Sequence, residues 1–128
     1  MTRRGPRERG GRGARGARAD AEPAVPMRVD RLPERDLAVL RVFTPEVGMD
    51  HKDLFKALTE ELLASPQSKL VVDLSKTRRI FSLFIGSLVD LHQRAGKESK
   101  TLTILAPKSI YEILQKMNLG DVLDVKVL

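Results

Sequence analysis

The 128-residue chain contains no cysteine and no tryptophan, and only 4% of its residues are aromatic. Without cysteine it can form neither disulfides nor thiolate metal sites, so we expect a cytoplasmic, reducing environment. The scarcity of aromatic rings argues against a platform on which the bases of single-stranded nucleic acid could stack. The two histidines, His51 and His92, fit no metal-ligand spacing, so we expect no metal and no cofactor.

The sequence also has no long hydrophobic run. Its longest uncharged apolar stretch, residues 80–89, covers about half of the roughly 20 residues that a membrane-spanning helix needs. The basic N-terminus is followed by no apolar segment, so we expect neither membrane insertion nor a secretory signal. Nor does the sequence contain a nucleophile–base motif or a paired-carboxylate motif. We therefore expect no enzyme, and Asp73, at the end of a predicted strand, is more typical of a turn-capping residue.

The net charge of +6 is concentrated in the first 26 residues, which hold seven arginines and three acidic residues among glycine, alanine and proline. This segment has too little apolar surface to offset its ordering entropy, so we expect residues 1–26 to be disordered. One interpretation is an electrostatic contact with nucleic acid. The others are a solvated extension without a specific role, or an upstream start assignment with Met27 as the true first residue. The absence of aromatics between the arginines favours these last two.

Residues 27–128 are long enough to form one domain, and their hydrophobic pattern alternates between strand and helix. Strands are predicted at residues 27–32, 37–43, 69–74, 101–106 and 122–128, and helices at about 50–64, 82–95 and 110–117. Asp50, Ser82 and Ser109 are the expected N-caps, and Gly96 is the expected C-terminal glycine. This β-β-α-β-α-β-α-β order predicts an α/β fold. We expect a mixed, mainly parallel sheet that opens with a hairpin and is covered by helices mainly on one face.

The predicted helix 82–95 has two different faces. Its core face carries apolar residues at helical spacing, namely Phe84, Leu88, Leu91 and Ala95, with Ile85 and Val89 beside them. Its opposite face is polar except for one large apolar residue near the helix start: it comprises Leu83, Ser87, Asp90 and Arg94.

Leu83 and Gly86 are unusual in this helix. Leu83 is a large apolar residue on the polar face, and Gly86 is an interior glycine, which costs roughly 1 kcal/mol of helix stability relative to alanine. An exposed apolar side chain beside a glycine is what a partner surface needs: one residue to be buried and one to allow close approach. The candidate partner-binding residues are therefore Ser82, Leu83, Gly86, Ser87 and Asp90. An alternative remains open, in which Leu83 folds back over its own domain.

Three basic residues, Lys76, Arg78 and Arg79, precede the same helix, whose N-terminal dipole also favours anions. They are candidates for holding a nucleotide phosphate or an acidic partner. No glycine-rich phosphate loop accompanies them, so a solvated basic loop is the favoured interpretation.

The stretch LVVDLSKTRRIFSLFIGSLVDL at residues 70–91, followed by TLTILAP and YEILQKMNLGDVLDV, resembles the STAS domain, the fold of bacterial anti-sigma-factor antagonists. Asp73, Leu74 and Ser75 match the family's D-L-S at the end of a strand. The residues that match its I-D-S-S-G-L-G-x-L element are Ile80, Ser82, Ile85, Gly86 and Leu88. The resemblance covers residues 27–128.

Departures from the family pattern fall on its regulatory site. The second serine of D-S-S-G, which a cognate anti-sigma kinase phosphorylates to release the partner, is Leu83 here. The preceding aspartate is Phe81 and the first glycine is Phe84. Ser82 keeps a hydroxyl one position earlier, where we expect it to cap the helix.

The resemblance implies a non-enzymatic, anti-sigma-factor antagonist-like regulator in a partner-switching circuit. Its partner would be a kinase-like ATPase that acts as anti-sigma factor, and Leu83 would not be phosphorylated. A second option is an accessory subunit of a lipid-transport ABC system, which would bind a transporter ATPase, because STAS proteins of that kind often lack the serine. A homodimer and nucleic-acid binding through residues 1–26 are further options.

Overall fold

The computed structural model describes residues 25–128, so the disorder expected for the tail concerns residues that lie almost entirely outside the described part. The main sheet has the order β1-β2-β4-β6-β7. Its strands are β1 (Met27–Leu32), β2 (Leu37–Val42), β4 (Lys69–Asp73), β6 (Thr101–Ala106) and β7 (Asp124–Val127). The helices are α1 (Lys52–Ala64), α2 (Ser82–Lys97) and α3 (Lys108–Lys116). β1 and β2 are antiparallel and the other neighbours are parallel, which confirms the predicted mainly parallel sheet with an opening hairpin.

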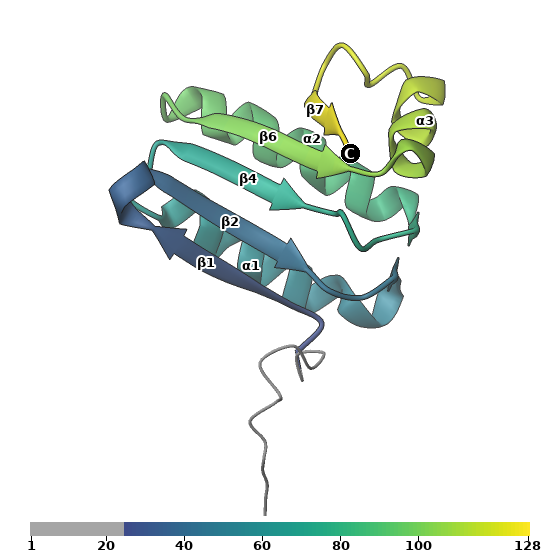
Figure 1. Cartoon of the computed structure of the whole chain (residues 1–128), viewed down its shortest axis with the longest axis horizontal. Helices are drawn as coiled ribbons and strands as arrows, with labels where there is room; N and C mark the ends of the chain where they lie inside the picture. Colours follow the sequence, from purple (N-terminus) through teal and green to yellow (C-terminus); the bar gives the residue numbers. More distant parts are fainter. Residues whose placement is uncertain (1–24) are drawn as a thin grey trace, which may run out of the picture.

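The strands follow one another across the sheet in chain order. Every right-handed crossover therefore places its helix on the same face. In Figure 1, α1 and α2 lie side by side behind the sheet. The rings of Phe55 on α1 and Phe84 on α2 meet edge to face, with centroids 5.2 Å apart. The main core lies between this helical layer and the sheet, where Leu40, Val72 and Ile104 are fully buried.

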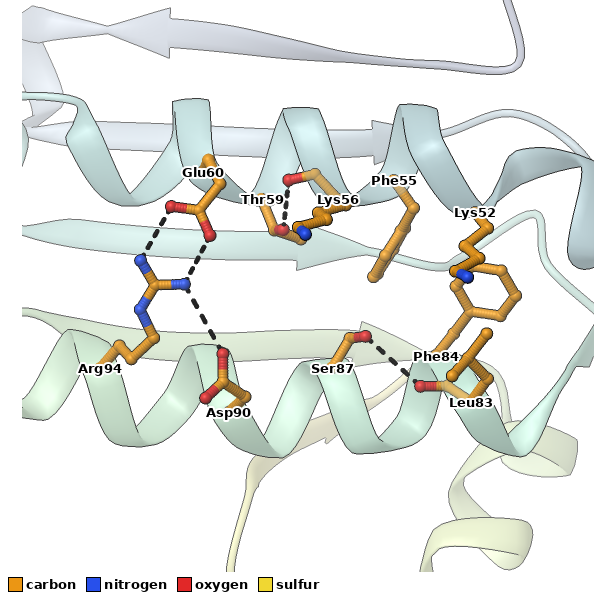
Figure 2. A pocket seen from close by; sticks show the side chains of 10 residues that line it. All are labelled: Lys52, Phe55, Lys56, Thr59, Glu60, Leu83, Phe84, Ser87, Asp90 and Arg94. Carbon is orange, nitrogen blue, oxygen red and sulfur yellow. Dashed lines mark hydrogen bonds and ion pairs between the residues drawn. The ribbon is translucent and has the colours of Figure 1, made fainter.

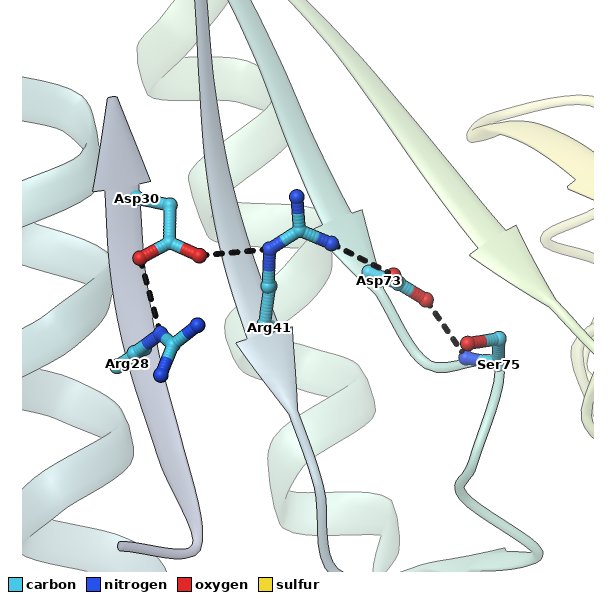
Figure 3. A network of polar contacts seen from close by, with 5 residues as sticks. All are labelled: Arg28, Asp30, Arg41, Asp73 and Ser75. Atoms are coloured by element: carbon cyan, nitrogen blue, oxygen red, sulfur yellow. Dashed lines mark hydrogen bonds and ion pairs between the residues drawn. The ribbon is translucent and has the colours of Figure 1, made fainter. Parts of the chain in front are cut away.

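The opposite face of the sheet has no helix over it within residues 25–128, and it carries a network of charged side chains instead (Figure 3). Arg41 on β2 donates from Nε to Oδ2 of Asp30 on β1 at 2.7 Å and lies 3.6 Å from Asp73 on β4. Arg28 donates to the other oxygen of Asp30 at 2.9 Å. Val39, directly opposite Asp30 on this face, is only 5% exposed. The long charged side chains thus shield apolar residues on a face that parallel sheets ordinarily bury under helices.

Replacing Arg41 by alanine is expected to lower the free energy of unfolding by about 1 kcal/mol, because the change removes both the link between two carboxylates and the cover over Val39. Denaturant unfolding measures this loss. Arg35→Ala is the matched control, since Arg35 is exposed in the β1–β2 turn and should shift stability by less than about 0.5 kcal/mol. Equal losses in the two variants would show that the network does not shield the sheet.

The predictions for the helix starts of α2 and α3 were wrong by one and two residues. Phe81 is the N-cap of α2 and Pro107 that of α3, so Ser82 and Ser109 already lie inside their helices. Neither cap forms a side-chain hydrogen bond. Both caps have extended backbone, and their carbonyls accept the first helical N–H groups, so no serine cap is needed.

Asp50 is not the N-cap of α1 either. It lies within a short 3-10 turn, Met49–His51, and α1 begins only at Lys52. The Gly48 N–H donates to Nδ1 of His51 at 3.1 Å, so the histidine ring caps the turn that leads into the helix.

The C-terminus of α2 also differs from the prediction, because Gly96 remains helical. The left-handed residue is Ser99, with φ of 61°. The Lys100 N–H donates to the Ala95 carbonyl at 2.9 Å and the Ser99 N–H to the Gly96 carbonyl at 3.1 Å. These two bonds define a Schellman motif, which ends the helix two residues later than the glycine suggested.

Candidate functional site

A second, two-stranded parallel sheet holds the starts of α1 and α2 together. It consists of β3 (Glu46–Val47) and β5 (Arg79–Ile80), neither of which the sequence predicted. The Phe81 N–H donates to the Val47 carbonyl at 3.2 Å, and the Arg78 N–H to the Pro45 carbonyl at 2.7 Å. The loop before α1 and the loop before α2 are thereby joined, so the N-terminal ends of both helices lie at the same end of the domain.

Leu83 lies in the first turn of α2 with 46% of its surface exposed, so it does not fold back over the domain. Two apolar neighbours at this end of the molecule are exposed as well: Phe81 at 43% and Met49 at 53%. The Phe81 ring lies beside Gly48, where an added Cβ would be 3.9 Å from its Cζ. The sequence predicted the exposure of Leu83 but not that of Phe81 and Met49 at the same end of the domain.

The predicted partner-binding residues all lie along one side of α2. We call them the α2 N-terminal surface: Ser82, Leu83, Gly86, Ser87 and Asp90. Ser82, Gly86 and Asp90 are exposed, and the half-buried Ser87 donates its hydroxyl to the Leu83 carbonyl at 3.3 Å. A Cβ added at Gly86 would meet nothing within 4 Å, so no internal contact requires glycine there.

A groove of about 250 Å³ runs between α1 and α2 beside this surface (Figure 2). It is lined from α2 by Leu83, Phe84, Ser87, Asp90 and Arg94, and from α1 by Lys52, Phe55, Lys56, Thr59 and Glu60. Three residues of the α2 N-terminal surface therefore face the groove. The α1 side was missed because hydrophobic periodicity shows which face of a helix is buried but not which helix lies beside it.

An ion pair joins the two helices at one end of the groove. The Arg94 guanidinium on α2 donates to both carboxylate oxygens of Glu60 on α1, at 2.5 and 2.8 Å, and lies 3.6 Å from Asp90 (Figure 2). These hydrogen bonds hold the pKa of Glu60 below its usual value and raise the pKa of Arg94. The pair is solvent-exposed, so it contributes little to the stability of the fold.

The Glu60→Gln variant should differ from the wild type in its free energy of unfolding, by an amount that depends on pH. Because the folded-state pKa of Glu60 is depressed, its ionised form contributes stability above its unfolded-state pKa, and this contribution is lost as pH falls through the folded-state pKa. The stability advantage of the wild type over the variant should therefore shrink as pH falls from about 6 to about 3. Urea unfolding at a series of pH values measures it. A stability difference that stays constant over this range would show that the hydrogen bonds from Arg94 do not lower the pKa of Glu60.

The basic loop before α2 is exposed at Lys76, Arg78 and Arg79. Nε of Arg79 lies 3.3 Å from a carboxylate oxygen of Glu46, which reduces the charge that this residue offers an anion. Lys76 and Arg78 form no ion pair with any residue in the described range 25–128. Anion binding by this loop stays a prediction.

Comparison with protein families identifies residues 27–125 as a match to the model described as "Mlab, STAS domain". The chain belongs to the STAS domain family. No functionally curated protein matches it. Among the described residues, no helix of this STAS domain combines the length and apolar character needed to span a membrane.

Solved structures share the fold of this STAS domain. One is the anti-sigma factor antagonist SpoIIAA in its unphosphorylated form, with 12% identity, a TM-score of 0.64, and coverage of 80% of this chain and 87% of that one. Another is an anti-sigma factor antagonist from Mycobacterium paratuberculosis, with 20% identity, a TM-score of 0.66, and coverage of 77% and 82%. The TM-scores show a common fold, and at these low sequence identities the similarity shows the fold alone.

Proposed function

We propose that this STAS domain is a non-enzymatic, anti-sigma-factor antagonist-like regulator that binds its protein partner through the α2 N-terminal surface, without phosphorylation at Leu83. The observation that carries the proposal is the 46% exposure of Leu83 in the first turn of α2. The resemblance places the family's phosphorylated serine at this position. Leucine has no hydroxyl to accept a phosphate, so binding at this surface would not be released by modification of that residue.

The chemistry of the surface supports recognition of a protein rather than a small molecule. Burying a leucine side chain completely is worth about 1.5–3 kcal/mol, and Leu83 and Phe81 each have nearly half of their surface left to bury. The open space at Gly86 lets a partner backbone approach the helix closely. Large apolar anchors with a polar rim, here Ser82 and Asp90, are typical of protein interfaces.

A second candidate function is an accessory subunit of a lipid-transport ABC system, with a transporter ATPase as the partner. The specific observation in its favour is again Leu83, because STAS proteins of that kind often lack the phosphorylatable serine. Both candidates use the same surface and differ in the class of ATPase bound.

Affinity capture from native cell extract with the full chain as bait separates the two. An ATPase with a kinase-like fold, identified by mass spectrometry, is the expected result for the leading proposal. Recovery of a transporter ATPase would replace that proposal with the second candidate. Recovery of neither class, or of nucleic acid alone, would contradict both candidates.

A further inference from the structure

We infer that the groove between α1 and α2 binds an acidic segment of the protein partner. The segment would place one large apolar side chain against Leu83 and Phe84, and its carboxylates beside Lys52 and Lys56. This inference rests on the proposed function, because the groove continues directly from the α2 N-terminal surface and shares Leu83, Ser87 and Asp90 with it.

The size of the groove argues for side chains rather than a free small molecule. Sites for cofactors and drug-sized ligands usually measure about 300–1,000 Å³. The groove between α1 and α2 measures about 250 Å³, so it suits one or two side chains of a bound segment.

One end of the groove is apolar, and Leu83 is its exposed residue. The rings of Phe55 and Phe84, each about 1% exposed, form its inner wall, and Leu83 stands at its rim (Figure 2). A large apolar side chain placed here would lie over the two rings and bury mainly the exposed surface of Leu83. Such a central apolar anchor carries most of the binding energy in many interfaces.

The groove lining is positive on balance: three basic residues, Lys52, Lys56 and Arg94, stand against Glu60 and Asp90. Arg94 lies 3.6 Å from Asp90 and is hydrogen-bonded to Glu60, so both acidic side chains are engaged at the far end of the groove. Lys52 and Lys56 lie one turn apart on α1, both exposed, and neither forms an ion pair with any residue between 25 and 128. In this domain two lysines lie next to a site for an apolar side chain. A segment that carries carboxylates next to a large apolar residue would complement both features, so the charge points to an acidic segment.

The polar end of the groove limits how the segment can lie. The Glu60–Arg94 pair spans from one helix to the other at this end, and Leu83 lies at the opposite end (Figure 2). A bound segment would therefore run from the α2 N-terminal surface into the groove, and its contact at Ser87 would follow its contact at Leu83.

The natural chain contains no cysteine, so a single introduced cysteine gives a unique attachment point for a photoactivatable crosslinker. Ser87→Cys reports on the groove, Ser82→Cys on the α2 N-terminal surface, and Glu112→Cys on the exposed side of α3 as a control. The labelled full chain is irradiated in native cell extract, and the crosslinked partner peptides are sequenced by mass spectrometry. We expect the Ser82 and Ser87 positions to label the same protein and the Glu112 position not to label it. The peptide labelled from Ser87 should contain aspartate or glutamate beside a large apolar residue.

Charge reversal tests the electrostatic part of the inference. Lys52→Glu combined with Lys56→Glu should reduce labelling from Ser87 at least tenfold. Lys97→Glu combined with Lys116→Glu changes the net charge equally at exposed sites elsewhere and should leave it unchanged. Labelling from Ser82 alone, a basic peptide labelled from Ser87, or equal effects of the two charge reversals would overturn the groove assignment and leave the proposed function standing. Labelling from neither Ser82 nor Ser87 would overturn both.

Discussion

Replacing Leu83 by aspartate should abolish partner capture while leaving the fold intact. Leu83 is 46% exposed in the first turn of α2, and a carboxylate there stays solvated in the free domain and is favoured by the helix dipole. In the complex the same carboxylate would be removed from water with no hydrogen-bond donor or positive charge to compensate it, at a cost of several kcal/mol of binding free energy. A loss of about 3 kcal/mol corresponds to a decrease in affinity of more than about 100-fold. Quantitative affinity capture with the full-length wild type and variant measures it.

The control for this experiment is Val122→Asp, because Val122 is a comparably exposed apolar residue, at 44%, between α3 and β7. It should retain capture. Circular dichroism and thermal unfolding should show both variants to be as well folded as the wild type. Unchanged capture by a folded Leu83→Asp protein would mean that the α2 N-terminal surface is not where the partner binds.

The architecture could be predicted from sequence because the hydrophobic pattern is strong along most of the chain. The run Leu70, Val71 and Val72 has the composition of a buried parallel strand, and the stripe through Phe84 and Leu88 has the spacing of a helix with one buried face. The order of these elements then fixes the crossovers and thus the side of the sheet that the helices cover. Each step uses local information and a general rule of chain connection.

The exact helix ends and the short strands could not be predicted in the same way. Phe81 is a poor N-cap by composition, yet its N–H is bonded to Val47, a residue more than 30 positions earlier, and this contact sets where α2 begins. β3 and β5 have two residues each, too few for a periodic pattern. Ser99 adopts the left-handed conformation expected of Gly96 because the following Lys100 N–H reaches back to Ala95. These features depend on tertiary contacts that override local preference.

The sequence predicted the residues of only one of the two walls of the candidate site, the wall formed by α2. Leu83 was found because an apolar residue on a polar helix face departs from the helix's own pattern. Lys52 and Lys56 follow the ordinary pattern of a solvated face, so nothing in the sequence distinguishes them. Only the structure shows that they line the same groove as Ser87 and Asp90.

The buried aromatic residues between α1 and α2 should also contribute strongly to the stability of the domain. Phe84→Ala is expected to lower the free energy of unfolding by about 3–5 kcal/mol, because Phe84 is 1% exposed and the surrounding core can only partly fill the cavity that the change leaves. This is a large fraction of the roughly 5–15 kcal/mol that stabilises a typical domain. Chemical denaturation measures the loss. Phe81→Ala is the matched control, since Phe81 is 43% exposed and should cost less than about 1 kcal/mol.

A double-mutant cycle connects this stability to the groove. Phe55→Ala and Phe84→Ala remove the two rings that meet edge to face at 5.2 Å, and the cycle should give a coupling energy of about 0.5–1.5 kcal/mol. Strictly additive losses, or a cost for Phe84→Ala no greater than that for Phe81→Ala, would show that the two helices are not held together through these rings. If the coupling is present, the same pair of rings both fixes α1 against α2 and forms the apolar wall of the groove. The conformation that binds a partner segment is then already present in the free domain, and binding does not have to supply the free energy of assembling it.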